Sequence, residues 1–292
     1  MKKFKLSLIC GVLFSANALL LPQLAHSDEG KLLATGGVSE LEGAGGGGLT
    51  PWALITGYGT RDAIGGSTHY THVGTANFTL DSVGAAVGIY DRIELSVAQM
   101  TFNTGFTGTA LGLGADFSFR QDIIGLKVKV AGDAVYDQDS FMPQIAVGLQ
   151  YKRNKEDKLV RALGAKSNSG TDVYVAATKI LLDKSLLLNG TVRATKANQI
   201  GILGFGGDLK NSYHAEFEAS AAYLLDKHTA VGMEYRTKPD NLSFAHESNW
   251  ADFFVAYFPS KQISFTAGYA MLGSIATVQN QNGPYVSVQA SF

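Results

Sequence analysis

The sequence predicts an all-β fold: a transmembrane antiparallel up-and-down β-barrel of about 12 strands, which follows a cleaved signal peptide. Apolar and polar residues alternate along most of the chain, as expected for strands with two different faces. No apolar run after the leader reaches the 18 residues that a membrane helix needs. Short polar turns and longer connections also alternate, which is typical of membrane barrels.

Composition excludes several other classes of protein. The chain has 292 residues, a formal net charge of −1 and only 17% charged residues, against roughly a quarter in an ordinary soluble domain. The 46% of hydrophobic residues excludes a disordered charged tail. The small net charge excludes a nucleic-acid binder that depends on bulk positive charge, and the single cysteine excludes a disulfide-stapled scaffold.

Residues 1–27 have the layout of a secretory signal peptide. Three lysines precede an apolar stretch at 6–21, and Ala25-His-Ser27 forms a small-residue cleavage site. An uncleaved membrane anchor is the alternative, which Pro22 and the short apolar run disfavour. Cleavage removes three lysines, no acidic residue and the only cysteine, Cys10, so the exported chain has a net charge of −4 and no thiol.

The alternation is clearest at residues 213–223. Tyr213, Phe217 and Tyr223 share one face with small apolar residues, whereas Glu216 and Glu218 lie on the other. A soluble sandwich also alternates, but its outward face is usually rich in charge. Here the polar faces are small and lightly charged and the apolar faces carry aromatic residues near strand ends, which favours a barrel facing lipid.

Placing strands between the turns gives twelve spans, an even number that puts both termini on the periplasmic side. The segment 103–122 is long enough to hold another strand pair, so 14 strands is the alternative. The expected spans are 51–59, 71–90, 93–103, 123–131, 143–152, 172–182, 186–196, 213–224, 229–238, 250–258, 262–272 and 284–292.

The two ends of the exported chain differ in character. Residues 28–50 form a Gly-rich segment, and the barrel is expected to occupy 51–292. The run Gly43–Gly48 lacks the Lys-Ser/Thr of a phosphate loop, so we expect a flexible segment or one inserted into the lumen. The chain ends in Phe292 after alternating apolar residues, which resembles the signal that barrel-assembly machinery reads.

Metal ligation has little support in the sequence, and no metal or cofactor is expected. Asp133, Asp137 and Asp139 share a turn on the periplasmic side, but the glycine and distal glutamate of a calcium loop are missing. His69 and His72 lie three residues apart in the expected first outside loop, without an evident third ligand.

A catalytic site is not expected either. His214 and Glu216 share a strand face, and a barrel lipase would need a serine nucleophile beside such a histidine. Ser212 and Ser220 are near in sequence only, and no nucleophile motif accompanies them. We therefore expect a protein that is not an enzyme, with a barrel lipase as the weakest alternative.

Charged residues on the polar faces predict the lining of the lumen. Opposed basic and acidic walls would orient a small polar or charged solute in a pore. The alternative is a network of interior ion pairs that fills a barrel which conducts nothing. The expected lining residues are Glu94, Lys127, Lys129, Lys152, Lys179, Arg193, Glu216, Glu218, Glu234, Arg236 and Asp252.

Two connections have unusual composition for loops outside the membrane. The segment 153–166 has five basic residues against two acidic ones, and we expect it to meet lipopolysaccharide phosphates or attract anions. The segment 201–207 is apolar and is expected to fold inward, as a constriction or as an apolar access site.

Several runs of the exported chain are distinctive: those at 33–52, 88–96, 130–133, 137–140, 195–199 and 204–208. Together they resemble an uncharacterised proteobacterial envelope family, domain of unknown function 3034. The resemblance covers nearly all of the exported chain, and it implies an exported barrel without an established substrate or catalytic residues.

These observations predict an outer-membrane barrel of a Gram-negative bacterium that serves as a narrow pore or uptake channel for a small, unidentified solute. A non-conducting structural or adhesion barrel is the alternative. The expected partners are outer-membrane lipid, lipopolysaccharide, the assembly machinery that meets Phe292, and the solute; no nucleic acid is expected.

Overall fold

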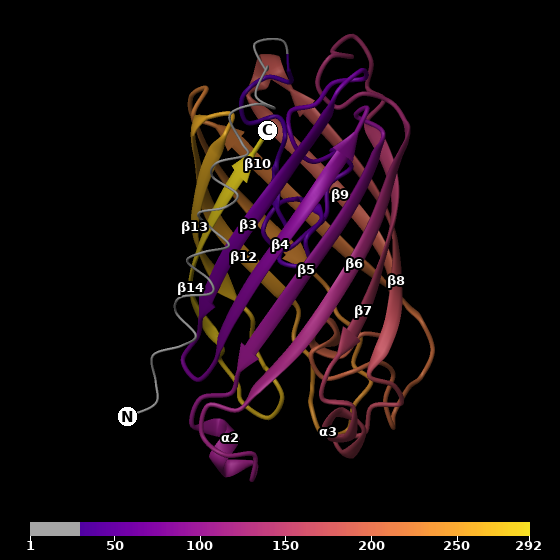
Figure 1. Cartoon of the computed structure of the whole chain (residues 1–292), viewed down its shortest axis with the longest axis vertical. Coiled ribbons are helices and arrows are strands. Elements are labelled where there is room, and N and C mark those ends of the chain that lie inside the picture. The colour runs from indigo at the N-terminus through magenta and orange to yellow at the C-terminus, as the bar shows by residue number, and fades with distance from the viewer. Residues whose placement is uncertain (1–29) are drawn as a thin grey trace.

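The computed structural model describes residues 30–292, so the expected signal peptide at 1–27 lies outside the described part. Twelve antiparallel strands form a closed barrel, in which β14 pairs with β3 (Figure 1). The strands are β3 (Ile64–Gly74), β4 (Thr79–Ile89), β5 (Ile93–Asn103), β6 (Ser118–Ala131), β7 (Gln144–Asn154), β8 (Ser169–Leu181), β9 (Leu186–Thr195), β10 (His214–Leu224), β11 (Thr229–Arg236), β12 (Trp250–Ser260), β13 (Ile263–Met271) and β14 (Asn282–Ser291).

The predicted count of twelve is confirmed, although two of the expected spans are wrong. Residues 51–59 form no wall strand, so the wall begins at Ile64 rather than at 51. The expected span 71–90 contains only the end of β3, then the turn at Thr75–Phe78 and β4. This turn lacks proline and glycine and interrupts the alternation only briefly. The segment 103–122 contains the short helix α2 (Thr107–Ala110) instead of an extra strand pair.

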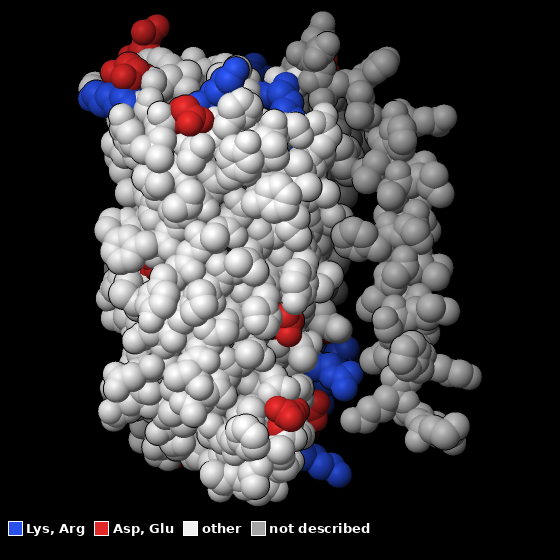
Figure 2. All heavy atoms as spheres, turned by 90° about the vertical axis from the view of Figure 1, so that its left-hand side faces the viewer, with Lys and Arg blue, Asp and Glu red and all other residues white. Residues whose placement is uncertain are grey.

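The two faces of the wall follow the predicted alternation. On β10, the Phe217 side chain is 61% exposed on the outside, whereas Glu218 is 3% exposed on the inside. Figure 2 shows an outer surface with few charged residues over its middle and more toward its two ends. Such an apolar band suits contact with lipid. Among residues 30–292, no helix is long and apolar enough to cross a membrane.

The connections divide the barrel into a turn end and a loop end. Short turns, including η2 (Leu182–Lys184), lie at the same end as the C-terminus (Figure 1). The opposite end carries α2, α3 (Asp157–Ala162) and η3 (Asn198–Gly201). Four long loops there, at residues 155–168, 196–213, 237–249 and 272–281, are called the roof below.

Residues 30–63, called the plug below, lie inside the barrel. The plug contains a small hairpin of β1 (Val38–Ser39) and β2 (Gly45–Gly46), and nearly all of residues 35–56 are buried. Gly43 has φ +98°, and a Cβ there would lie 3.0 Å from the Ala98 Cβ of the wall. Glycine is therefore required for a left-handed backbone and a close approach, which confirms the lumen-inserted alternative for this segment.

Candidate functional site

The predicted lumen-lining residues point inward, and most of them are buried against the plug. Lys129 is partly exposed because it lies near the turn end, where it pairs with Asp91. Glu216 is partly exposed and accepts a hydrogen bond from Thr237. The buried members are Glu94, Lys127, Lys152, Lys179, Arg193, Glu218, Glu234, Arg236 and Asp252.

A cluster of cations from the wall surrounds two carboxylates of the plug. Arg236 Nη1 lies 2.8 Å from Glu42 Oε2, and Arg193 Nη2 lies 3.4 Å from Glu40 Oε1. Lys152 also forms an ion pair with Glu42. Both glutamates are fully buried. Burial of charge is tolerated where it is paired and hydrogen-bonded, so these pairs determine where the plug sits.

The same cations also bind carboxylates of the wall. Arg193 Nε lies 2.5 Å from Glu218 Oε1, and Lys152 Nζ lies 2.5 Å from Asp172 Oδ2. Together with Glu40 and Glu42, four acidic groups therefore face the three cations Lys152, Arg193 and Arg236. The cluster therefore holds one more acidic group than it holds cations.

Two further wall carboxylates accept hydrogen bonds from the plug backbone. Glu94 accepts from the amides of Gly45 and Thr56 at 2.9 and 2.8 Å, and it also pairs with Lys127 at 3.0 Å. Glu234 accepts from the amide of Leu49 at 2.7 Å. Charge-assisted bonds of this kind are stronger than neutral ones. They satisfy plug backbone groups that have few partners within their own segment.

The plug glutamates were absent from the predicted set of site residues. A signal for them exists, because Glu40 and Glu42 are the only acidic residues between 30 and 61. Two carboxylates in an apolar, Gly-rich segment need cationic partners if that segment is buried. The isolation of Glu40 and Glu42 in this segment therefore indicates that the segment inserts into the lumen, where Arg193, Arg236 and Lys152 can pair with them.

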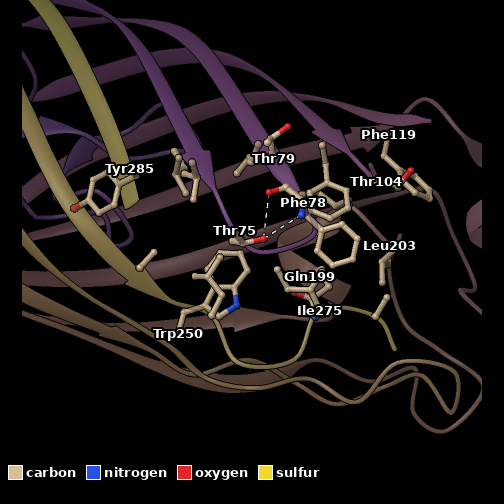
Figure 3. Close-up of a pocket in the computed structure, with 18 of the residues that line it drawn as sticks. Thr75, Phe78, Thr79, Thr104, Phe119, Gln199, Leu203, Trp250, Ile275 and Tyr285 are labelled. Atoms are coloured by element: carbon tan, nitrogen blue, oxygen red, sulfur yellow. Dashed lines mark hydrogen bonds between the residues drawn. The ribbon is translucent and has the colours of Figure 1, made fainter. Parts of the chain in front are cut away.

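An apolar cavity of about 200 Å³ lies at the loop end of the lumen, between the plug and the roof (Figure 3). Ile202 and Leu203 come from the segment 201–207, so the predicted inward folding of this segment is confirmed. The main apolar contacts come from Val38, Leu41 and Leu49 of the plug, Phe78, Phe102, Phe119 and Trp250 of the wall and its turns, and Ile202, Leu203 and Ile275 of the roof.

Gln199 ties three roof loops together above this cavity. Its amide donates to Glu247 Oε1 at 2.7 Å, and its side chain accepts from Lys238 Nζ at 2.9 Å and donates to the Ser274 carbonyl at 3.3 Å. Gln199 and Ile200 both have positive φ, +45° and +57°. Such backbone strain persists only where the surroundings enforce it, and the pairing of Lys238 with Glu247 at 3.0 Å contributes to that enforcement.

Replacement of Glu247 by alanine is expected to loosen the roof. Burial lowers the pKa of Lys238 to about 8 even with its partner present, and loss of that partner leaves an uncompensated buried cation, at a cost of about 3–5 kcal/mol. Hydrogen exchange at residues 197–206 measures the change. Glu247→Gln keeps an acceptor for the Gln199 amide, so hydrogen exchange at these residues should be slower than in Glu247→Ala. Equal protection in Glu247→Ala and the wild type would contradict this role.

A second, polar cavity of about 520 Å³ lies at the turn end. It is lined by Lys31 of the plug together with Asp91 and Asp133 of the turns. Lys31 Nζ lies 2.7 Å from Asp91 Oδ1 and also donates to the Ile55 carbonyl. The plug therefore separates an apolar space at one end of the lumen from a polar space at the other.

The metal-ligand candidates have other partners. Asp133 Oδ1 accepts the amides of Val135 and Tyr136 at 2.9 and 2.8 Å, which is a turn-capping role. His69 and His72 lie on β3 rather than in an outside loop, because the hairpin begins earlier than expected. They are separated by the wall, with His69 inside and His72 bound to Asp81 outside. Residues 30–292 contain no cluster of three metal-ligating side chains.

The groups considered for a lipase do not come together. His214 Nε2 is buried and has no hydrogen-bond partner among the described residues, and Glu216 bonds to Thr237. Ser220 donates to Glu234 and accepts from the Trp52 indole, so it is part of the plug contact. A nucleophile needs a base within hydrogen-bond reach, which this arrangement does not supply.

The chain end and the basic loop have local partners as well. The Phe292 carbonyl accepts from the amides of Tyr58 and Gly66 at 3.1 and 3.0 Å, which joins the plug base to the end of the wall. In the segment 153–166, Arg161 pairs with Asp157 at 2.8 Å. The expected contacts with assembly machinery and lipopolysaccharide stay predictions.

Solved outer-membrane barrels have a similar fold at low sequence identity. The KdgM porin is 12% identical and matches with a TM-score of 0.50 over 77% of this chain and 99% of that chain. The COG4313 outer membrane channel from Pseudomonas putida F1 is 12% identical, with a TM-score of 0.45 over 81% and 97%. Outer membrane phospholipase A from Escherichia coli is 9% identical, with a TM-score of 0.44 over 81% and 94%.

Among curated proteins, none matches the chain. A protein family does match, over residues 35–289, and it is described as a protein of unknown function. That range contains most of the plug and nearly the whole barrel wall, including all but the first two residues of the motifs that carried the resemblance noted above. The chain therefore belongs to the family DUF3034.

Proposed function

We propose that this barrel is an outer-membrane uptake channel for a small solute, and that the plug closes its path in the state described here. The observation that carries the proposal is the arrangement of one cavity at each end of the lumen with the plug between them. The apolar outer surface and the likeness to small porins support placement in the outer membrane, with the roof outside.

The way the plug is held is compatible with movement. The plug is covalently continuous with the wall at residue 64 and contributes no strand to it, so its displacement breaks no inter-strand ladder of the wall. Its anchors include ion pairs and hydrogen bonds, which water can replace at modest net cost, alongside apolar contacts of Leu41, Leu49 and Trp52. A core made only of interlocked apolar side chains would resist such an exchange more strongly.

A disulfide between plug and wall tests this proposal. Thr50 Oγ1 and Ser220 Oγ lie 2.5 Å apart, so cysteines at both positions should satisfy disulfide geometry. In planar bilayers, the reduced Thr50→Cys/Ser220→Cys protein should show opening events, and oxidation should abolish them. Reduction should then restore them, because only the tether has changed.

The control links two wall strands and leaves the plug free. Thr68 and Ala290 are paired neighbours on β3 and β14 whose side chains face away from the lumen, so Thr68→Cys/Ala290→Cys reports on oxidation alone and should conduct in both states. A folded barrel that is silent in every state would reject the channel and favour the non-conducting structural barrel.

A further inference from the structure

The apolar cavity beneath the roof has the properties of a ligand site. We propose that it binds a small, neutral, largely apolar molecule that carries one hydrogen-bond acceptor, such as a carbonyl or ether oxygen. As the solute site of the channel, this inference rests on the proposed function and specifies its substrate class. Size, charge and hydrogen bonding each contribute to the assignment.

The size of the cavity limits the ligand. Its volume is about 200 Å³, and a protein cavity of about 150 Å³ lined by apolar side chains stays dry and holds benzene. A molecule with on the order of ten non-hydrogen atoms therefore fits. A whole lipid acyl chain or an oligosaccharide exceeds this volume.

The lining excludes a charged ligand. None of the described residues that line the cavity is acidic, basic or a histidine. Charged groups close to the lining already have partners: Glu234 accepts from the Leu49 amide, Asp252 accepts from the Tyr285 hydroxyl at 2.6 Å, and Lys238, beside the Trp250 ring, pairs with Glu247. A charged solute would lose its hydration without gaining a partner, which costs several kcal/mol.

One hydrogen-bond donor in the lining is unused. The indole Nε1 of Trp250 is buried and has no hydrogen-bond partner among the described residues, and the Trp250 side chain is 3% exposed. By contrast, Thr75 Oγ1 donates to Gln281 and Thr104 Oγ1 to the Phe117 carbonyl. Buried donors are nearly always satisfied, so the free indole N–H predicts an acceptor on the ligand.

The orientation of Trp250 is enforced by its neighbours. Lys238 Nζ lies 4.1 Å from the centre of the indole ring, and a cation held over a ring in this way restricts its rotation. In Figure 3 the indole nitrogen lies on the side of the ring toward Gln199 and Ile275, which belong to the cavity lining. The unpaired donor therefore belongs to a ring that lines the cavity and is held by its neighbours.

The floor of the cavity is the plug itself. Leu41 and Leu49 line the cavity, and Leu49 follows the Gly-rich run whose backbone approaches Glu234. A bound molecule would contact the movable element directly. Occupancy of the site and position of the plug are therefore linked, because a ligand shifts any equilibrium between states that bind it differently.

Fluorine NMR on the purified full chain tests the site. The probe is 4-(trifluoromethyl)cyclohexanone, and its partner probe has a methylene group in place of the carbonyl oxygen. The ketone should bind roughly three- to tenfold more tightly, the value of one hydrogen bond. Trp250→Phe keeps a ring but removes the donor, and it should bring this ratio to about one.

Two alanine-to-phenylalanine variants distinguish binding in the cavity from partition of the probe into detergent. Ala270 lines the cavity and is 2% exposed, whereas Ala219 faces outward on β10. Ala270→Phe should abolish the bound signal of both probes, and Ala219→Phe should retain it. All variants are first checked for the anomalous gel mobility of a folded barrel.

The outcomes distinguish this site from the proposed function. Equal binding in Ala270→Phe and Ala219→Phe, or a ketone preference that survives Trp250→Phe, overturns the site assignment. If the ketone binds but the reduced Thr50→Cys/Ser220→Cys protein shows no conductance, the ligand site is retained and the channel is rejected. Conductance without binding retains the channel and rejects this substrate class.

Discussion

Deletion of residues 30–60 is expected to convert a barrel that opens rarely into one that conducts continuously. The plug fills the lumen between the two cavities and supplies no wall strand, so the ring of twelve strands stays closed without it. The inward charges, among them Glu94 and Arg193, then face water instead of the plug. Single-channel recordings should show a long-lived open state with several-fold higher mean current than the wild type.

A milder variant keeps the full chain and weakens the plug alone. Glu40→Gln/Glu42→Gln removes the two carboxylates that the wall cations hold, and opening should become more frequent without a change in current per opening. Asp137→Asn/Asp139→Asn, in an exposed turn, makes the same charge change and should leave conductance unaltered. Closed recordings from both the deletion and the Gln variant would mean that the roof, not the plug, blocks the path.

The wall of the barrel could be predicted from the sequence because strand alternation is local. Each strand shows its two faces within about ten residues, as on β10, where Phe217 and Glu218 point to opposite sides. The position of a strand along the chain was harder to predict. The β3–β4 turn consists of Thr75–Phe78, residues that also occur in strands, and the Thr75 side chain accepts from the Phe78 amide to close it.

The structure places the expected inner residues on the inner face of the wall, but the sequence did not identify their partners. Alternation places Arg193 and Arg236 inside the barrel, yet it says nothing about what fills the lumen. Their contacts with Glu40 span more than 150 positions of sequence, and no local pattern encodes such a distance. In the structure the inner charges form ion pairs with the plug, as in the interior ion-pair network that was the alternative to a charged pore, and an apolar cavity lies beyond them.

The apolar cavity could not be predicted from the sequence for the same reason. Its lining combines Leu41 of the plug, Phe102 of the wall and Leu203 of the roof, which come together only once the barrel has closed. One part of it was visible beforehand, since an apolar run at 201–207 is difficult to account for in a solvated loop. A loop that lacks polar residues is expected to be buried, but its sequence does not identify the residues against which it packs.

Replacement of Arg193 by leucine is expected to destabilise the protein by about 3–5 kcal/mol. The guanidinium is fully buried and lies within 4 Å of carboxylate oxygens from Glu40, Glu42, Asp172 and Glu218. Without it, two cations remain for four acidic groups. Urea unfolding, followed by the change in gel mobility of the barrel, measures the loss.

The loss should depend on the charge balance of the cluster rather than on the size of the removed side chain. Arg153→Leu makes the same substitution at an exposed site and should cost less than about 0.5 kcal/mol. In Arg193→Leu/Glu218→Leu, three acidic groups face two cations, which restores the original excess of one. A buried pair replaced by apolar residues is often neutral, so the double variant should recover most of the stability. If the two single losses instead add, the cluster does not act as a unit, and the seating of the plug depends on shape alone.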